Sequence, residues 1–162
     1  MAVAPEACGR TSAVVEKAKT LELDPMSANE KVAIAIVGDL KDWQKLNVVA
    51  FLASSIAIQF PETHGKAFIT ASKSQYLPFL KHPILIYRAD STDELRRSFQ
   101  RAKDRNLSIG IYTRPLFATK NEEENHIEIS KIADDQQDLV GIIVYGDGRA
   151  VSKSLDGLKF HP

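Results

Sequence analysis

The feature that most constrains the fold is an unbroken run of six apolar residues, VAIAIV, at positions 32–37. The run does not alternate apolar with polar side chains, which is typical of a β-strand buried on both faces. Gly38 and Asp39 end the run, and apolar residues then recur at helical spacing from about residue 44 to 60, where Pro61 stops the pattern. A strand, a turn and a helix in this order predict a sheet that is covered by helices.

Three further strands are expected over 84–87, 107–112 and 139–145, with helices over 91–105 and about 121–133 between them. The first of these helices opens with the sequence STDE, which has the pattern of a capping box. For the stretch 66–82 we expect a strand over its first six residues and a short turn or helix near its end. The alternation predicts an α/β fold, a three-layer α/β/α sandwich with a mostly parallel or mixed sheet of about four strands.

The length of 162 residues fits one domain, here 31–162, preceded by an N-terminal appendage of residues 1–30. Lysine and arginine number 21, and aspartate and glutamate also number 21, which argues against a protein whose main task is to neutralise phosphates. Because Cys8 is the only cysteine, no intramolecular disulfide can form, and we expect a cytoplasmic protein. We expect neither a secretory signal nor a membrane span, and therefore no membrane partner.

No cofactor and no metal are expected. The four histidines lack metal-ligand spacing, and neither a phosphate-binding glycine motif nor a G-x-S-x-G nucleophile elbow occurs. The zero net charge nevertheless hides two patches, because the helix over 91–105 is rich in arginine and the segment 121–138 is acidic. Either both patches are solvated helix faces, or the basic one is a binding face for RNA or for an acidic partner.

Polar residues follow the ends of three predicted strands: Asp39 follows the first, Thr113 and Arg114 the third, and a Gly-Asp-Gly turn the last. Ligands of open α/β sheets bind where the carboxyl ends of parallel strands meet. Lys45 and Asn47 lie near the start of the helix after Asp39, where unpaired backbone N–H groups favour anions. We expect Asp39 and Lys45 as catalytic candidates, and Asn47, Thr113 and Arg114 as contacts of a small polar or anionic ligand. The alternative is structural, with Asp39 shaping a turn and Asn47 acting as a buried hydrogen-bonding group.

Two segments, VAIAIVGDLKDWQKLNVVAFLASSIA from residue 32 and LVGIIVYGDGRAVSKSLDGLKF from residue 139, resemble the uncharacterised bacterial family called domain of unknown function two-thousand. The similarity covers about residues 30–160. That family is thought to share the fold of type 2 peptidyl-tRNA hydrolases. The resemblance therefore implies this fold, and we expect a homodimer.

The catalytic pattern of those hydrolases is only partly present. Counting from Asp39, the position of their lysine falls on Leu46, next to Lys45, and Pro115 stands where an aspartate should follow Arg114. Loss of that ammonium and carboxylate should remove most of the rate enhancement. We therefore expect a ligand-binding protein with a hydrolase-like fold, and tRNA is disfavoured as a partner. The alternatives are a peptidyl-tRNA or aminoacyl-ester hydrolase that uses Lys45, and a non-catalytic regulatory or binding module.

Overall fold

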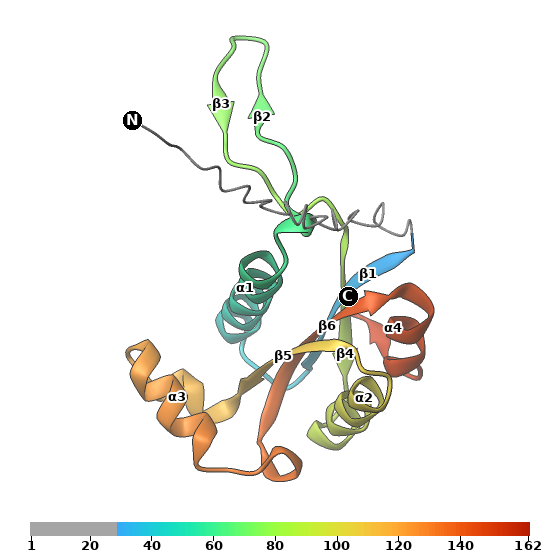
Figure 1. The fold of residues 1–162 in the computed structure, drawn as a ribbon. Coiled ribbons are helices and arrows are strands. Elements are labelled where there is room, and N and C mark those ends of the chain that lie inside the picture. The colour runs from blue at the N-terminus through green and yellow to red at the C-terminus, as the bar shows by residue number, and fades with distance from the viewer. Residues whose placement is uncertain (1–28) are drawn as a thin grey trace, which may run out of the picture.

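The computed structural model describes residues 29–162, so all but the last two residues of the expected appendage lie outside the described part. The main sheet contains β1 (Glu30–Val37), β4 (Ile84–Ala89), β5 (Ser108–Thr113), β6 (Leu139–Asp147) and β7 (Lys159–Phe160). The helices are α1 (Asp42–Gln59), α2 (Thr92–Asp104), α3 (Glu122–Ser130) and α4 (Gly148–Ser154), with short 3-10 turns η1 (Pro61–Thr63), η2 (Arg114–Ala118) and η3 (Asp134–Gln136). The strand order is β5-β6-β1-β4-β7 (Figure 1). The mixed α/β class is confirmed, with five strands in the main sheet rather than about four.

β1 lies in the centre of the sheet, as its apolar run predicts. Residues 32–37 are each at most 2% exposed. Val32 pairs in parallel with Ile84 of β4 on one side and in antiparallel with Tyr145 of β6 on the other. A strand with neighbours on both edges and helices on both faces needs apolar side chains at every position, which explains the lack of alternation.

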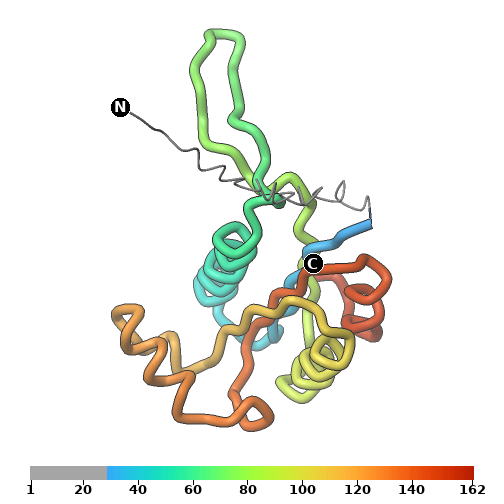
Figure 2. Tube along the Cα trace, in the orientation of Figure 1, coloured from blue at the N-terminus to red at the C-terminus, as the bar shows by residue number. Residues whose placement is uncertain are grey.

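Helices cover both faces of the sheet: α1 lies on one face, and α2 and α4 lie on the other (Figures 1 and 2). α1 buries Val48, Leu52 and Ile56, which recur every four residues. It packs against β6 at Gly141, where a Cβ atom would lie 2.5 Å from Val48 Cγ1 and 3.1 Å from Leu52 Cδ1. The missing side chain at Gly141 therefore sets how deeply α1 packs on the sheet.

The predicted start of α2 is confirmed at its cap. The Ser91 hydroxyl accepts a hydrogen bond from the Glu94 backbone N–H over 3.2 Å, and the Glu94 carboxylate accepts one from the Asp90 N–H over 2.8 Å. These bonds satisfy backbone donors that the first turn of a helix leaves unpaired. Among residues 29–162, no helix has both the length and the apolar character that crossing a bilayer requires.

β6 runs opposite to β1 and β5, and this corrects one expectation about the strand ends. Asp147 at the end of β6 pairs with Glu30 at the start of β1, so the Gly-Asp-Gly turn lies at the edge of the sheet remote from Asp39. The Asp147 carboxylate caps α4 by accepting bonds from the N–H groups of Arg149 and Ala150. Sequence could not show this, because a buried apolar strand reads the same in either direction.

Residues 65–80 form a hairpin that stands away from the rest of the domain (Figures 1 and 2). We call it the arm. Its two strands, β2 (Phe68–Ile69) and β3 (Gln75–Tyr76), pair only over two residues each. The strand expected over 66–71 is thus shorter than predicted, and no helix forms over 76–80.

Candidate functional site

β1 and β5 end at the same edge of the sheet, and their ends bring two predicted site residues together. Nη2 of Arg114 lies 3.9 Å from Oδ2 of Asp39. Nε of Arg114 lies 3.2 Å from Oδ2 of Asp138, the residue before β6. The Arg114 backbone N–H also donates to the Asp138 carbonyl over 2.9 Å. The guanidinium therefore sits between two carboxylates, one of which the sequence did not single out.

This ion-pair cluster of Asp39, Arg114 and Asp138 determines the charge at the edge. Two negative charges face one positive charge, so a bound anion would compete with both carboxylates for the guanidinium. All three side chains are exposed, and water weakens their mutual attraction. The cluster ties three strands together, and it does not present a free cation to a ligand.

The other predicted residues do not converge on this cluster. Lys45 and Asn47 are two residues apart on α1, so their side chains leave the helix about 200° apart and reach different surfaces. Thr113 is buried and leads from β5 into η2. Within residues 29–162, neither the Lys45 nor the Asn47 side chain makes a hydrogen bond or an ion pair.

Asn47 lines a groove of about 680 Å³ between α1, the end of β5, η2 and the start of α3. Four aromatic rings form its walls: Trp43 and Phe51 from α1, Tyr112 from β5 and Phe117 from η2. Their centroids are linked by distances of 5.8 Å (Trp43 to Phe117), 5.1 Å (Phe117 to Tyr112) and 6.1 Å (Tyr112 to Phe51). We call this the aromatic groove. Its size and its apolar walls are typical of a small-molecule site.

The rim of the aromatic groove on the η2 and α3 side is polar and mostly engaged. The Thr119 hydroxyl donates to the Leu116 carbonyl over 2.7 Å and also contacts Oδ1 of Asn125. Lys120 and Glu122 contribute one charge of each sign to the lining. The groove therefore has no excess charge that would select a cation or an anion.

Among the polar groups next to the aromatic walls, those of Asn47 and Tyr112 remain available to a ligand. Neither the Asn47 amide nor the Tyr112 hydroxyl has a hydrogen-bond partner in the described part of the chain. Burial raises the pKa of Tyr112, so its phenol stays neutral and can donate a hydrogen bond. An amide that both donates and accepts, next to a neutral phenol, suits a ligand with uncharged polar groups.

Sequence reasoning missed the four aromatic residues because it searched for polar and titratable groups. The signal that could have found them is a second stripe on α1. Trp43, Phe51 and Ile58 lie outside the buried stripe of the helix, although their side chains are large and apolar, and all three are exposed. Large apolar residues that a helix does not use for its core mark a surface that something else covers.

The basic face predicted on α2 is largely engaged within the domain. Arg96 lies 3.4 Å from Asp93, and Arg101 donates to a backbone carbonyl over 2.8 Å. Lys103 lies 2.7 Å from Asp134, so the basic helix is joined to the acidic segment. Because Arg96 and Lys103 already pair with carboxylates, α2 has fewer cations available for RNA phosphates than its composition indicates.

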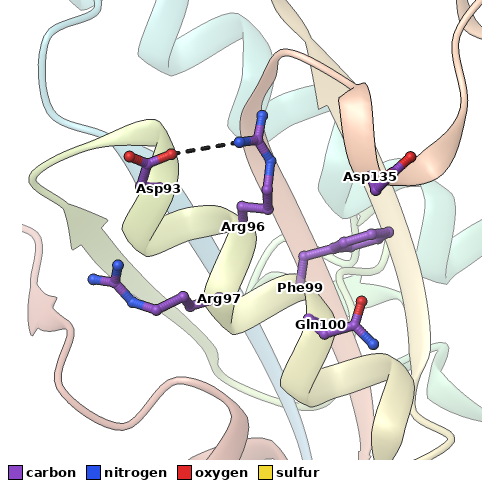
Figure 3. A pocket seen from close by; sticks show the side chains of 6 residues that line it. All are labelled: Asp93, Arg96, Arg97, Phe99, Gln100 and Asp135. Carbon is purple, nitrogen blue, oxygen red and sulfur yellow. Dashed lines mark hydrogen bonds and ion pairs between the residues drawn. The ribbon is translucent and has the colours of Figure 1, made fainter.

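A second pocket, of about 390 Å³, lies beside α2 (Figure 3). Arg96 and Phe99 extend from the helix, with Asp135 across from them, and Arg96 pairs with Asp93. Phe99 is only 8% exposed, so it offers a ligand little of its ring. No group of three or more His, Cys, Asp or Glu side chains in residues 29–162 has the arrangement of a metal site. The aromatic groove is therefore the stronger candidate.

Comparison with known proteins identifies the family. Residues 30–162 match the model of the family described as "Protein of unknown function (DUF2000)". The chain is also similar to a solved structure, that of the protein of unknown function Atu0240 from Agrobacterium tumefaciens str. C58. The TM-score is 0.79 and the identity 32%, over 83% of this chain and 98% of that one. Curated proteins gave no match. The chain belongs to the DUF2000 family.

Proposed function

We propose that the protein binds a small, uncharged, ring-containing ligand in the aromatic groove. One observation carries the proposal: four aromatic side chains surround two polar groups that have no partner in the described domain. The ring of the ligand would pack against Trp43 and Phe117. Its polar groups would bond to Asn47 and Tyr112.

The chemistry of the groove supports a neutral ligand. Binding of a flat ring against the aromatic walls is favourable, because it removes the apolar surface of both the ring and the walls from water. A carboxamide or a similar group could then accept from the Tyr112 hydroxyl and exchange hydrogen bonds with the Asn47 amide. Arg114 already contacts two carboxylates, so it offers no free positive charge to an anion. Of the polar or anionic ligands expected from the sequence, we therefore propose a polar, uncharged one.

Hydrolysis of an aminoacyl or peptidyl ester is the second candidate. The helices on both faces of the sheet support the three-layer fold of the type 2 peptidyl-tRNA hydrolases, and Asp138 supplies Arg114 with the carboxylate that Pro115 lacks. Lys45, however, leaves α1 on a different side from Asn47, and Leu46, at the expected lysine position, is exposed. Binding without chemistry is therefore supported better. The cytoplasmic location and the homodimer remain expectations.

Trp43 provides the test of the proposed function, because it is the only tryptophan in the chain and lines the groove. We expect benzamide to change the Trp43 fluorescence with a dissociation constant in the millimolar range, as is usual for a fragment. Benzoate has the same ring with a carboxylate, and it should bind at least five-fold more weakly. Acetamide lacks the ring and should not bind.

Two matched variants locate the binding. Asn47→Leu should weaken benzamide binding at least five-fold. Gln100→Leu, which removes an amide from the pocket beside α2, should leave it unchanged. Equal binding of benzoate and benzamide, or an unaltered affinity in Asn47→Leu, would contradict the proposal. Cleavage of peptidyl-tRNA that disappears in Lys45→Ala would instead establish the second candidate.

A further inference from the structure

We propose that the arm is a dimerisation element, and that the arms of two copies of this chain pack against each other in opposite directions, tip to base. This proposal goes beyond the function of the aromatic groove and does not depend on it. It concerns a different end of α1, where the helix leads through η1 into the arm.

The arm exposes more large apolar side chains than a free surface normally carries. Five of its sixteen positions hold such residues, and the body of the domain covers none of them: Phe68 is 49% exposed, Ile69 67%, Tyr76 60%, Leu77 84% and Phe79 74%. Contiguous apolar patches of this kind mark interaction sites.

These residues lie on both faces of the hairpin. Phe68 pairs with Tyr76, so their side chains share one face, and the Phe79 ring lies 4.9 Å from that of Phe68. Ile69 belongs to the opposite face, and the alternation of β3, continued by one residue beyond Tyr76, places Leu77 on the side of Ile69. A two-stranded hairpin is only marginally stable by itself in water. An arm with apolar side chains on both faces therefore needs a surface that covers it.

The same molecule carries a surface that fits. An open pocket of about 520 Å³ lies at the base of the arm, and neither a carboxylate nor a lysine or arginine lines it. Its lining is mainly apolar and comes from α1, the arm and the start of β4: Ala53, Ala57, Phe79, Leu80 and Ile84, with Ser54 and His82. When an apolar projection and an apolar pocket adjoin on one chain, a two-fold axis lets each copy fill the pocket of the other. The pocket would contribute no carboxylate, lysine or arginine to such an interface.

The available area is sufficient for a dimer. A fully buried aromatic side chain covers about 150–250 Å². At the exposures given above, the five side chains offer at most about 600 Å² per copy, or about 1,200 Å² for the pair, when the partner's arm covers one face and its pocket covers the other. This reaches the lower bound of stable protein interfaces before the pocket lining is included.

Charge favours the antiparallel arrangement. Lys73 lies at the tip of the arm and Glu62 in η1 at its base, and both are exposed. Between residues 65 and 80 the arm carries lysines but no carboxylate. Tip-to-base packing would bring Lys73 of one copy to Glu62 of the other, whereas parallel packing would bring the two Lys73 side chains together.

Sedimentation equilibrium of the full chain tests the proposal. We expect a dimer at micromolar concentrations, and we expect Leu77→Ser to raise its dissociation constant at least ten-fold. Leu46→Ser is the matched control, because Leu46 is a similarly exposed leucine (73%) outside the arm, and it should leave the dimer unchanged. Lys73→Glu should weaken the dimer at least three-fold, and adding Glu62→Lys should restore it.

Several results would overturn the proposal. One is a monomer at every concentration up to about 100 µM. This result would count against the proposal whether the arm is exposed, covered by another part of the chain or covered by a different partner. A Leu77→Ser dimer as tight as the wild-type dimer, or equal weakening by Leu46→Ser, would also do so. A dimer that Lys73→Glu leaves unchanged or tightens would contradict the antiparallel packing. Because Leu77 lies outside the groove, Leu77→Ser should not alter the response of Trp43 to benzamide, so this proposal can fail without the proposed function failing.

Discussion

Arg114 and Asp39 come from the ends of two different strands and form an ion pair of 3.9 Å at the edge of the sheet. The pair shows that the carboxyl ends of β1 and β5 meet, as the pattern of buried strands indicates. Asp138 approaches the same guanidinium more closely, at 3.2 Å. The cluster therefore links the start of β6 to this edge, and its residues do not line the aromatic groove that we propose as the binding site.

A double-mutant cycle should rank the two contacts of Arg114. Alanine variants of Arg114, Asp39 and Asp138 should give a larger coupling energy for Arg114 with Asp138 than with Asp39, because the first contact is shorter. Both couplings should stay below about 1 kcal/mol, since the side chains are exposed. The free energy of unfolding in urea provides the measurement. A coupling above about 2 kcal/mol, or the reverse order, would contradict this assignment.

Gly141 should tolerate substitution poorly. An alanine there would bring its Cβ within 2.5 Å of the Val48 methyl group, so α1 or β6 must shift. We expect Gly141→Ala to lower the free energy of unfolding by about 1–3 kcal/mol. In a Val48→Ala variant, whose opposing side chain is shorter, Gly141→Ala should lower the free energy of unfolding by less. An equal loss of free energy with and without Val48→Ala would mean that this contact does not set the position of the helix.

Tyr145 should make stability depend on pH in the alkaline range. Its hydroxyl donates to Oε2 of Glu30 over 2.6 Å, and burial together with this bond raises the pKa of Tyr145. An unfolded tyrosine loses its proton near pH 10, so above about pH 10 unfolding releases a proton that the folded protein retains. The free energy of unfolding should fall as the pH rises from 10 to 11. Below about pH 9 this tyrosine should contribute no pH dependence.

The control for this pH effect is Tyr145→Phe. It removes the titrating group and should therefore flatten the alkaline part of the profile. Part of the slope should remain, because burial also raises the pKa of Tyr112. A Tyr145→Phe profile as steep as that of the wild type would show that other groups cause the alkaline loss.

The protein should not retain tRNA at physiological salt. Arg96, Arg101 and Lys103 already bond within the domain, so few phosphate contacts remain for α2 to make. Filter binding between 50 and 200 mM salt would measure this directly. Tight retention that falls steeply as salt rises would show that α2 forms an electrostatic interface.

Sequence reasoning predicted the elements that carry long and regular patterns. The run over 32–37 located the central strand, and the serine cap located the start of α2. The proximity of Asp39 and Arg114 followed from the same logic, because strands that run in the same direction end at the same edge. These predictions succeed because burial and capping leave local marks in the sequence.

What sequence reasoning missed depends on contacts between distant segments. The direction of β6 leaves no trace in its apolar pattern, and β7 and α4 are too short to show periodicity. Asp138 has no distinguishing sequence pattern, and its contact with Arg114 is seen only in the folded structure. Trp43 and Phe117 form part of the aromatic groove only because α1 packs next to η2. No local sequence pattern predicts this tertiary contact.

The most direct test of the central claim is a heteronuclear NMR titration of the full chain with benzamide. A ligand in the aromatic groove should shift the indole N–H signal of Trp43 and the side-chain amide signals of Asn47, with the same saturation curve for both. The Gln100 side-chain amide, in the pocket beside α2, should not move. Shifts confined to Gln100, or no saturable shift at Trp43 and Asn47, would contradict the claim that the groove is the binding site.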